Sequence, residues 1–144
     1  MRPVRVDKMA VFKGIKKEWE NLEFEIDIDE TDNEVLAFKG GFSCDHFDDS
    51  VGVVAFIFDD EIAVEFVFDK ITPSLEAYTL INQFNKKSSY YIGYIDEDGY
   101  FATSYSARFF DEEDAIDEFR AAMNLITSDR TLQTLKPITD LTEG

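Results

Sequence analysis

The sequence has little of the material from which most catalytic and metal sites are built. Its 144 residues include one cysteine, Cys44, and one histidine, His46. A single cysteine excludes an intrachain disulfide and is compatible with a reducing compartment. A single histidine leaves little material for a Ser-His-Asp triad or a histidine-based metal site. The glycine patterns that bind nucleotide phosphates and the turn that presents a nucleophilic serine are also missing.

Long apolar runs are missing as well. No segment approaches the roughly 20 apolar residues that a transmembrane helix needs. The start of the chain, residues 1–19, is broken by charges and lacks the apolar segment of a signal peptide. We therefore expect a cytoplasmic protein without membrane contact, and we predict no cofactor.

Acidic side chains are abundant. Asp and Glu number 31 against 14 Lys and Arg, for a net charge of −17. The first twenty residues hold six cations and three acids, so they carry +3 and the remainder carries −20. The strongly acidic remainder of the chain repels nucleic acid and anionic lipid and favours a partner with a basic segment. Solubility alone is an equally simple explanation of the charge.

Hydrophobic periodicity in the first half predicts a helix followed by four strands. Residues 6–20 are a helix capped by Asp7, with Phe12, Ile15 and Trp19 on one side. Residues 22–29 alternate strictly between apolar and acidic, which is typical of a half-buried strand. Three more strands follow at 34–42, 51–58 and 61–70, and the run 51–58 is apolar on both sides, as in a central strand. Their short connections predict an antiparallel meander.

The second half reads as helix, strand, turn, strand, helix. Thr72 and Pro73 suit the start of a helix that ends near Asn85. Asp98-Gly99 is a strong hairpin signal between the next two strands. Asp111 caps the last helix, whose apolar side is predicted to be formed by Ile116, Phe119, Met123 and Ile126.

Together these elements predict an α+β fold with the order α-β-β-β-β-α-β-β-α. The sheet is antiparallel and the helices lie mainly on one of its faces. Residues 1–128 form a single domain. Residues 129–144 are polar and contain Pro137, so they are predicted to be a loose tail.

The aromatic hairpin is the first candidate for a binding surface. Alternation places Tyr90, Ile92 and Tyr94 on one face of its first strand and Tyr91 and Ile95 on the other. Because both faces of the hairpin carry large apolar side chains, one face can pack against helices and the other against a partner. Tyrosines also suit strands without any partner, so both interpretations stay open. The predicted partner-binding tyrosines are Tyr90, Tyr91, Tyr94, Tyr100 and Tyr105.

The acidic side of the first strand is the second candidate. Glu23, Glu25 and Asp27 share one face of the predicted strand and suit a basic segment of a partner. A solvated strand face explains the same pattern.

The loop Cys44–Asp49 contains the only thiol and imidazole of the chain. Zinc would need carboxylates to complete its four ligands there, because no second Cys or His pair exists. His46 follows Cys44 by two residues, but nothing in the sequence orients its ring as a catalytic base. We interpret the loop as a polar connection and predict no metal.

The stretch around the hairpin resembles the YbjN-like bacterial domain, a family also called sensory transduction regulators. The likeness lies in Asn82 and Asn85 near a helix end, the acidic hairpin with Asp98-Gly99, and the closing helix from Asp111. It extends over roughly residues 6–127, while the polar loop 43–50 and the many tyrosines depart from the family pattern. The resemblance implies a fold similar to type III secretion chaperones. It also implies a small, acidic, often dimeric protein that binds other proteins and has no catalytic residues.

The leading functional hypothesis is a non-enzymatic protein-binding module, chaperone-like or regulatory, that forms a homodimer. One alternative is an acidic mimic of DNA that occupies a nucleic-acid-binding protein. Another is an enzyme that uses carboxylates or a metal at the Cys44–Asp49 loop. No direct binding of nucleic acid is expected of this acidic chain.

Overall fold

The computed structural model describes residues 6–30, 35–43, 50–88 and 90–141. These residues form a short 3-10 helix, four α-helices and six strands. Their order is α1 (Lys8–Glu18), η1 (Glu20–Leu22), β1 (Glu25–Glu30), β2 (Val35–Phe42), β3 (Val51–Ile57), β4 (Glu61–Lys70), α2 (Leu75–Lys87), β5 (Ile92–Ile95), β6 (Tyr100–Arg108), α3 (Glu112–Ile126) and α4 (Asp129–Thr139).

The six strands form one antiparallel sheet in the order β1-β2-β3-β4-β6-β5. The first four strands are neighbours in chain order, as their short connections predict. β6 pairs with β4, so β5 becomes the edge strand of the second half. The α+β class with an antiparallel sheet, expected from the periodicity, is confirmed.

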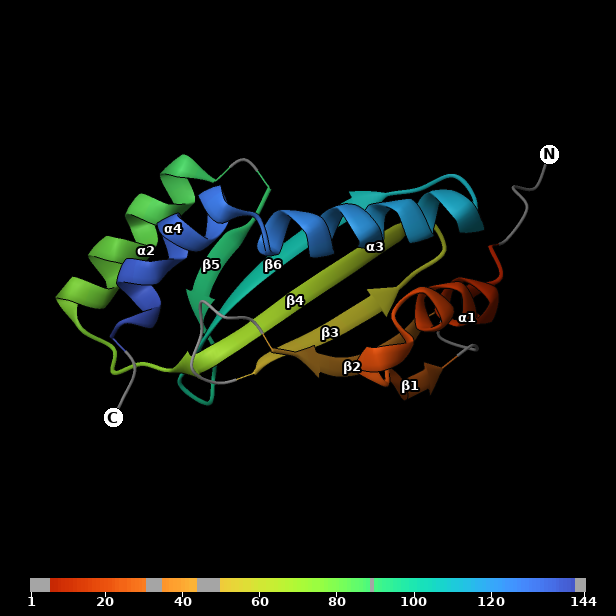
Figure 1. Cartoon of the computed structure of the whole chain (residues 1–144), viewed down its shortest axis with the longest axis horizontal. Helices are drawn as coiled ribbons and strands as arrows, with labels where there is room; N and C mark the ends of the chain where they lie inside the picture. The colour runs from red at the N-terminus through yellow and green to blue at the C-terminus, as the bar shows by residue number, and fades with distance from the viewer. Residues whose placement is uncertain (1–5, 31–34, 44–49, 89, 142–144) are drawn as a thin grey trace.

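All four helices lie on the same face of the sheet (Figure 1), which we call the helix face. The rings of Phe12 in α1 and Phe119 in α3 lie 5.3 and 5.5 Å from the ring of Phe38 in β2. At the other end of the sheet, Phe84 of α2 meets Phe101 of β6 at 6.5 Å. These contacts bury one side of every strand from β2 to β6.

The C-terminal segment is not a loose tail. Residues 129–139 form α4, which Ser128 caps by accepting a hydrogen bond from the Thr131 amide. Leu132, Leu135 and Ile138 are buried against the rest of the protein. The tail prediction was wrong because these three apolar residues recur at helical spacing inside a segment that is otherwise polar.

The first strand is shorter and less regular than its alternation predicts. Leu22 belongs to η1, and Glu23 has a positive φ of 52°, a left-handed conformation that interrupts the extended chain. A bulge between Ile26 and Ile28 then shifts the register against β2. The prediction of one continuous strand over 22–29 was therefore wrong at its beginning. The turn before β1 lets Phe24 pack against Phe38 at 5.2 Å.

Helix ends follow local capping chemistry. Asp7 and Asp111 cap α1 and α3 as predicted. The cap of α2, however, is Ser74, whose hydroxyl accepts from the Ala77 amide, and not Thr72. The residues from Thr72 to Ser74 precede the helix, which then continues to Lys87, beyond the predicted end near Asn85.

The edge strand β5 is closed by a side chain. The Asn85 amide nitrogen donates to the Gly93 carbonyl at 3.1 Å, and its oxygen accepts from the Gly93 amide at 2.6 Å. The Asn85 side chain thus imitates a neighbouring strand and satisfies backbone groups that an edge strand leaves open. Gly93 leaves space for the rings of Phe84 and Phe101, because a β-carbon there would lie 3.1 Å from both.

Replacing Leu135 with Ala should destabilise the protein by about 2–5 kcal/mol, because Leu135 is fully buried in α4. The exposed neighbour Gln133 provides the control, since Gln133→Ala removes no core contact. Urea denaturation followed by circular dichroism measures both. Equal stability of the two variants would contradict the packing of α4.

Replacing Asn85 with Ala should cost about 1–3 kcal/mol, because it leaves the Gly93 amide and carbonyl unpaired. Asn82→Ala in the same helix is the matched control, since Asn82 is exposed. Hydrogen exchange should show faster exchange of the Gly93 amide in Asn85→Ala alone. Unchanged Gly93 exchange in that variant would rule out the proposed closure of the edge.

Candidate functional site

The face of the sheet opposite the helices is the largest candidate site, and we call it the uncovered face. Residues that stand opposite each other in paired strands point to the same side, so the register identifies its members. They are Ala37, Lys39 and Gly41 in β2, Gly52, Val54 and Phe56 in β3, Ala63, Glu65 and Val67 in β4, Ala102, Ser104 and Ser106 in β6, and Ile92 and Tyr94 in β5. No helix among the described residues packs on this face.

The centre of the uncovered face carries exposed apolar side chains. Val54, Phe56 and Val67 are half-buried, whereas Ile92 is 65% exposed. Glycine, alanine and serine occupy the positions between the larger side chains, and Ala37 and Ala102 among them are buried. An apolar sheet face is suited to stack on another sheet or on a helix.

The sequence did contain a signal for this surface. The run 51–58 is apolar on both sides, which predicted a central strand with both faces buried. β3 does lie between β2 and β4. Its residues Val51, Val53, Ala55 and Ile57 are buried under the helices, but its alternate residues are only half-buried. The second apolar face is therefore left without cover from the described part of this chain.

Tyr94 lies on the uncovered face, as does Tyr100 at its rim, two residues before Ala102 in β6. The Tyr94 hydroxyl donates to the Glu65 carboxylate at 3.0 Å, across the intervening strand β6. Burial and the adjacent Glu65 carboxylate raise the pKa of Tyr94 to about 12. The Tyr94 hydroxyl is therefore protonated at all physiological pH values, and the neutral side chain forms part of the uncovered face.

Tyr91 and Tyr105 belong to the core beneath the helices. The Tyr91 hydroxyl donates to the Ala122 carbonyl of α3, and the Tyr105 hydroxyl donates to Glu118 at 2.8 Å. Burial is the main cause that raises the pKa of both tyrosines. Both side chains are buried. Their hydrogen bonds hold α3 against the sheet, and they offer no accessible surface to a partner.

Tyr90 and Tyr100 lie at separate places. Tyr90 is 60% exposed, just before β5, where Ser88 begins the connection from α2. Tyr100 lies at the hairpin turn, with the Lys70 ammonium 5.3 Å from its ring centre. The five predicted tyrosines are therefore divided among the core, the uncovered face and two rims, and do not form one surface.

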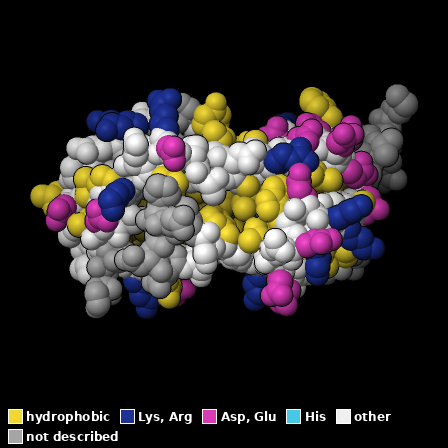
Figure 2. All heavy atoms as spheres, in the orientation of Figure 1, with side chains coloured by type: hydrophobic (Ala, Val, Ile, Leu, Met, Phe, Trp, Pro, Cys, Tyr) yellow, Lys and Arg dark blue, Asp and Glu magenta, His cyan; other side chains and the backbone are white. Residues whose placement is uncertain are grey.

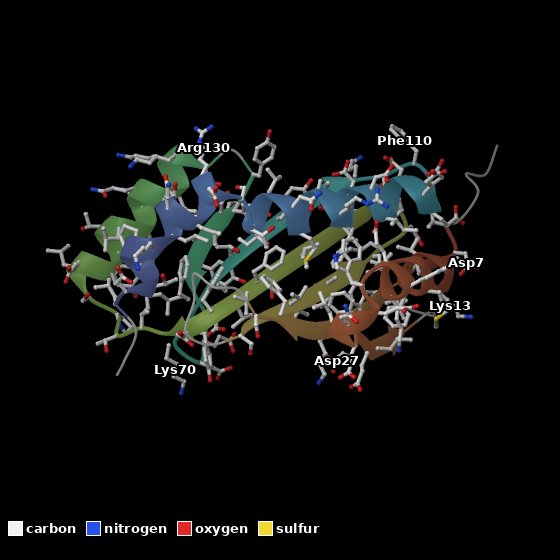
Figure 3. The ribbon with its side chains drawn as sticks, in the orientation of Figure 1. Asp7, Lys13, Asp27, Lys70, Phe110 and Arg130 are labelled. Carbon is white, nitrogen blue, oxygen red and sulfur yellow. The ribbon has the colours of Figure 1, made fainter. Side chains whose placement is uncertain are left out.

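Of the three predicted acidic residues, Glu25 and Asp27 both lie beside Lys39, and Glu23 lies apart from them. Glu23 lies before β1, in its left-handed conformation. Glu25 stands opposite Lys39, and the Asp27 carboxylate lies 3.4 Å from the Lys39 ammonium. Figure 3 shows Asp27 at the lower rim of the molecule, beside β1. Lys39 thus neutralises part of the acidic side on which docking was predicted.

The metal hypothesis concerned Cys44–Asp49, a loop that falls outside the described residues. Within the described ranges, no group of three or more His, Cys, Asp or Glu side chains is arranged to hold a metal ion. None of the described helices is both long and apolar enough to cross a bilayer. No protein-family model, curated protein or solved structure matches this chain significantly.

The raised pKa of Tyr94 predicts a pH dependence of stability. The unfolded chain releases this proton near pH 10, while the folded protein retains it to about pH 12. The contribution is therefore complete below pH 10 and is lost as the pH rises from about 10 to about 12. Tyr94→Phe should show a shallower loss of unfolding free energy over this interval in urea titrations.

The exposed Tyr78 of α2 supplies the matched control. Tyr78→Phe should follow the wild-type pH dependence. A Tyr94→Phe profile that coincides with the wild type would show that the hydrogen bond to Glu65 has no such effect.

Proposed function

We propose that this protein is a non-enzymatic protein-binding module and that the uncovered face of its sheet is the binding surface. The single observation that carries the proposal is the apolar centre of that face, formed by Val54, Phe56 and Val67 and left without a helix. Apolar surface of this kind, bordered by polar groups, is typical of protein–protein interfaces.

The first partner we propose is a second copy of the same chain. Two molecules with a net charge of −17 repel each other wherever acidic surfaces meet. The described charged side chains of the uncovered face nearly cancel, because the three cations Lys39, Lys70 and Arg108 lie on the same side of the sheet as the four acids Glu25, Asp27, Glu61 and Glu65. Two copies can therefore approach through this face with less repulsion than through the rest of their surfaces.

The chemistry of the two sheet edges favours binding of a second copy through the uncovered face over pairing of its strand with an edge of the sheet. The β5 edge is closed at Gly93 by Asn85. The β1 edge carries the acidic residues Glu25 and Asp27, which favour an extended basic segment if a different polypeptide binds. A chaperone-like or regulatory role in the cytoplasm, on a fold similar to type III secretion chaperones and YbjN-like domains, remains part of this proposal.

The oligomeric state tests the proposal. Light scattering coupled to size-exclusion chromatography should find a dimer at low and at high salt, because apolar contact is little affected by screening. Val54→Glu should give a folded monomer, with the dimer dissociation constant raised about a hundredfold or more by an unpaired buried charge. Within the chain Val54 stands between Lys39 of β2 and Glu65 of β4, so the new carboxylate of the isolated subunit meets one charge of each sign.

Leu75→Glu is the matched control, since Leu75 is 85% exposed on α2, away from the uncovered face. This variant should remain dimeric, and circular dichroism should show that both variants are folded. A monomeric wild-type protein at about 100 μM would contradict the proposal, because dimers of functional strength are filled at that concentration. A dimeric Val54→Glu variant would also contradict it.

A further inference from the structure

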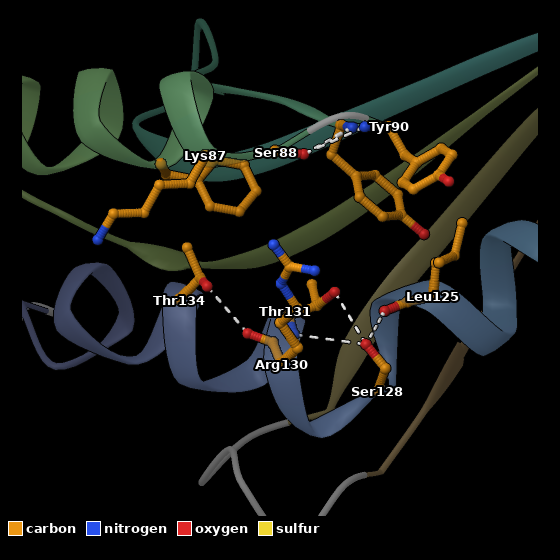
Figure 4. A pocket seen from close by; sticks show the side chains of 10 residues that line it. Lys87, Ser88, Tyr90, Leu125, Ser128, Arg130, Thr131 and Thr134 are labelled. Atoms are coloured by element: carbon orange, nitrogen blue, oxygen red, sulfur yellow. Dashed lines mark hydrogen bonds between the residues drawn. The ribbon is translucent and has the colours of Figure 1, made fainter.

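A pocket of about 230 Å³ opens on the helix side of the molecule (Figure 4). It lies between the end of α2, the start of β5 and the start of α4. Phe84, Tyr91 and Leu125 supply its apolar wall, and hydroxyl groups and two cations complete it. An engineered cavity of about 150 Å³ holds benzene, so this pocket has room for one ring with a charged group attached.

The charge of the pocket is opposite to that of the protein. None of the residues that line it is acidic, although Asp and Glu number 31 in the chain. Lys87 and Arg130 both line it, and neither forms an ion pair with any residue in the described part of the chain. Figure 2 shows Lys and Arg side chains at both ends of the molecule, whereas acidic side chains are more frequent over the end opposite this pocket.

The walls are held by hydrogen bonds within the protein. The Ser88 hydroxyl oxygen accepts from the Tyr91 amide at 2.9 Å, and the Tyr91 hydroxyl donates to the Ala122 carbonyl. The Thr134 hydroxyl donates to the Arg130 carbonyl at 2.9 Å, so its proton is not directed at a ligand. The donors left for a ligand are therefore mainly the guanidinium of Arg130 and the ammonium of Lys87. In Figure 4 the Arg130 side chain reaches from α4 into the space between α2 and Tyr90.

A neighbouring hollow extends the site along the groove between α2 and α4. It has a volume of about 270 Å³ and shares Phe84, Lys87 and Thr134 with the first pocket. Its remaining lining is neutral, with Gln83 and Gln133 on the two facing helices. None of the residues that line this groove is acidic, so no carboxylate in the lining would repel a bound anion.

The geometry points to a binding site for a small aromatic anion, an aryl phosphate or aryl carboxylate, with its charged group at Arg130; the Lys87 ammonium points away from that guanidinium and adds positive charge along the lining. Arg is the residue best suited to such oxygens, because its planar fork donates two parallel hydrogen bonds. The ring lies against Phe84 and Leu125, and the half-exposed Tyr90 flanks the entrance. This site does not depend on the proposed dimer, because its residues are on the helix side of the sheet.

Titration of the full-length, ¹⁵N-labelled protein with phenyl phosphate tests the inference. The amide signals of Ser88, Tyr90 and Thr131 should shift with saturation, and benzoate should shift the same signals. Inorganic phosphate and phenol each lack one half of the ligand, so they should bind at least about tenfold more weakly. Absence of shifts at about 10 mM phenyl phosphate would overturn the inference, since even a millimolar site is filled there.

A charge variant locates the site. Arg130→Gln should weaken phenyl phosphate binding about tenfold, because it removes a charge-assisted hydrogen bond. Lys136→Gln changes the net charge equally on the same helix but lies outside the pocket lining, so it should bind within about twofold of the wild type. Equal affinity of Arg130→Gln and wild type, or inorganic phosphate binding as tightly as phenyl phosphate, would also overturn the inference. Neither result depends on the oligomeric state, so the proposal of this binding site and the proposal of the dimer can be rejected independently of each other.

Discussion

The packing of aromatic rings around Phe38 is the constraint on which the rest of the structure depends. Phe12, Phe24 and Phe119 surround this ring at 5.2–5.5 Å, and Trp19 lies edge-on to Phe119 at 5.0 Å. These rings bring α1, the turn before β1 and α3 onto one side of β2. Large aromatic side chains bury more apolar area than any others, so the helices gather where the rings are. No helix from the described part of the chain lies on the opposite face of the sheet.

This one-sided arrangement separates two surfaces of different chemistry. The uncovered face combines apolar side chains with charges that nearly cancel, which suits a second protein surface. The pocket between α2 and α4 is small and cationic in a strongly acidic molecule, which suits a small anion. Lys87 and Arg130 lie where α2 ends and α4 begins. Acidic residues crowd the first turn of α3, where they also favour the positive end of the helix.

Much of the fold could be predicted from local patterns. The alternation in β4, the hairpin at Asp98-Gly99 and the caps Asp7 and Asp111 are all local features, and the structure has them. The errors also have local causes. The polar residues of α4 concealed its apolar side, and no alternation pattern reveals the left-handed Glu23. Alternation correctly placed Tyr91 and Tyr94 on opposite faces of the sheet, but it did not show that the Tyr91 hydroxyl is bound by α3 in the core.

The sequence by itself determined the periodicity of each element, the antiparallel class of the sheet and the acidity of the whole. Periodicity shows which residues of a strand share a side, because side chains alternate regardless of the neighbouring elements. It does not show which side is covered. Only the tertiary structure decided that the second apolar side of β3 stays open and that Asn85 closes β5. Only the tertiary structure brought Lys87 and Arg130 to one pocket. These outcomes depend on contacts between distant segments, which no local pattern contains.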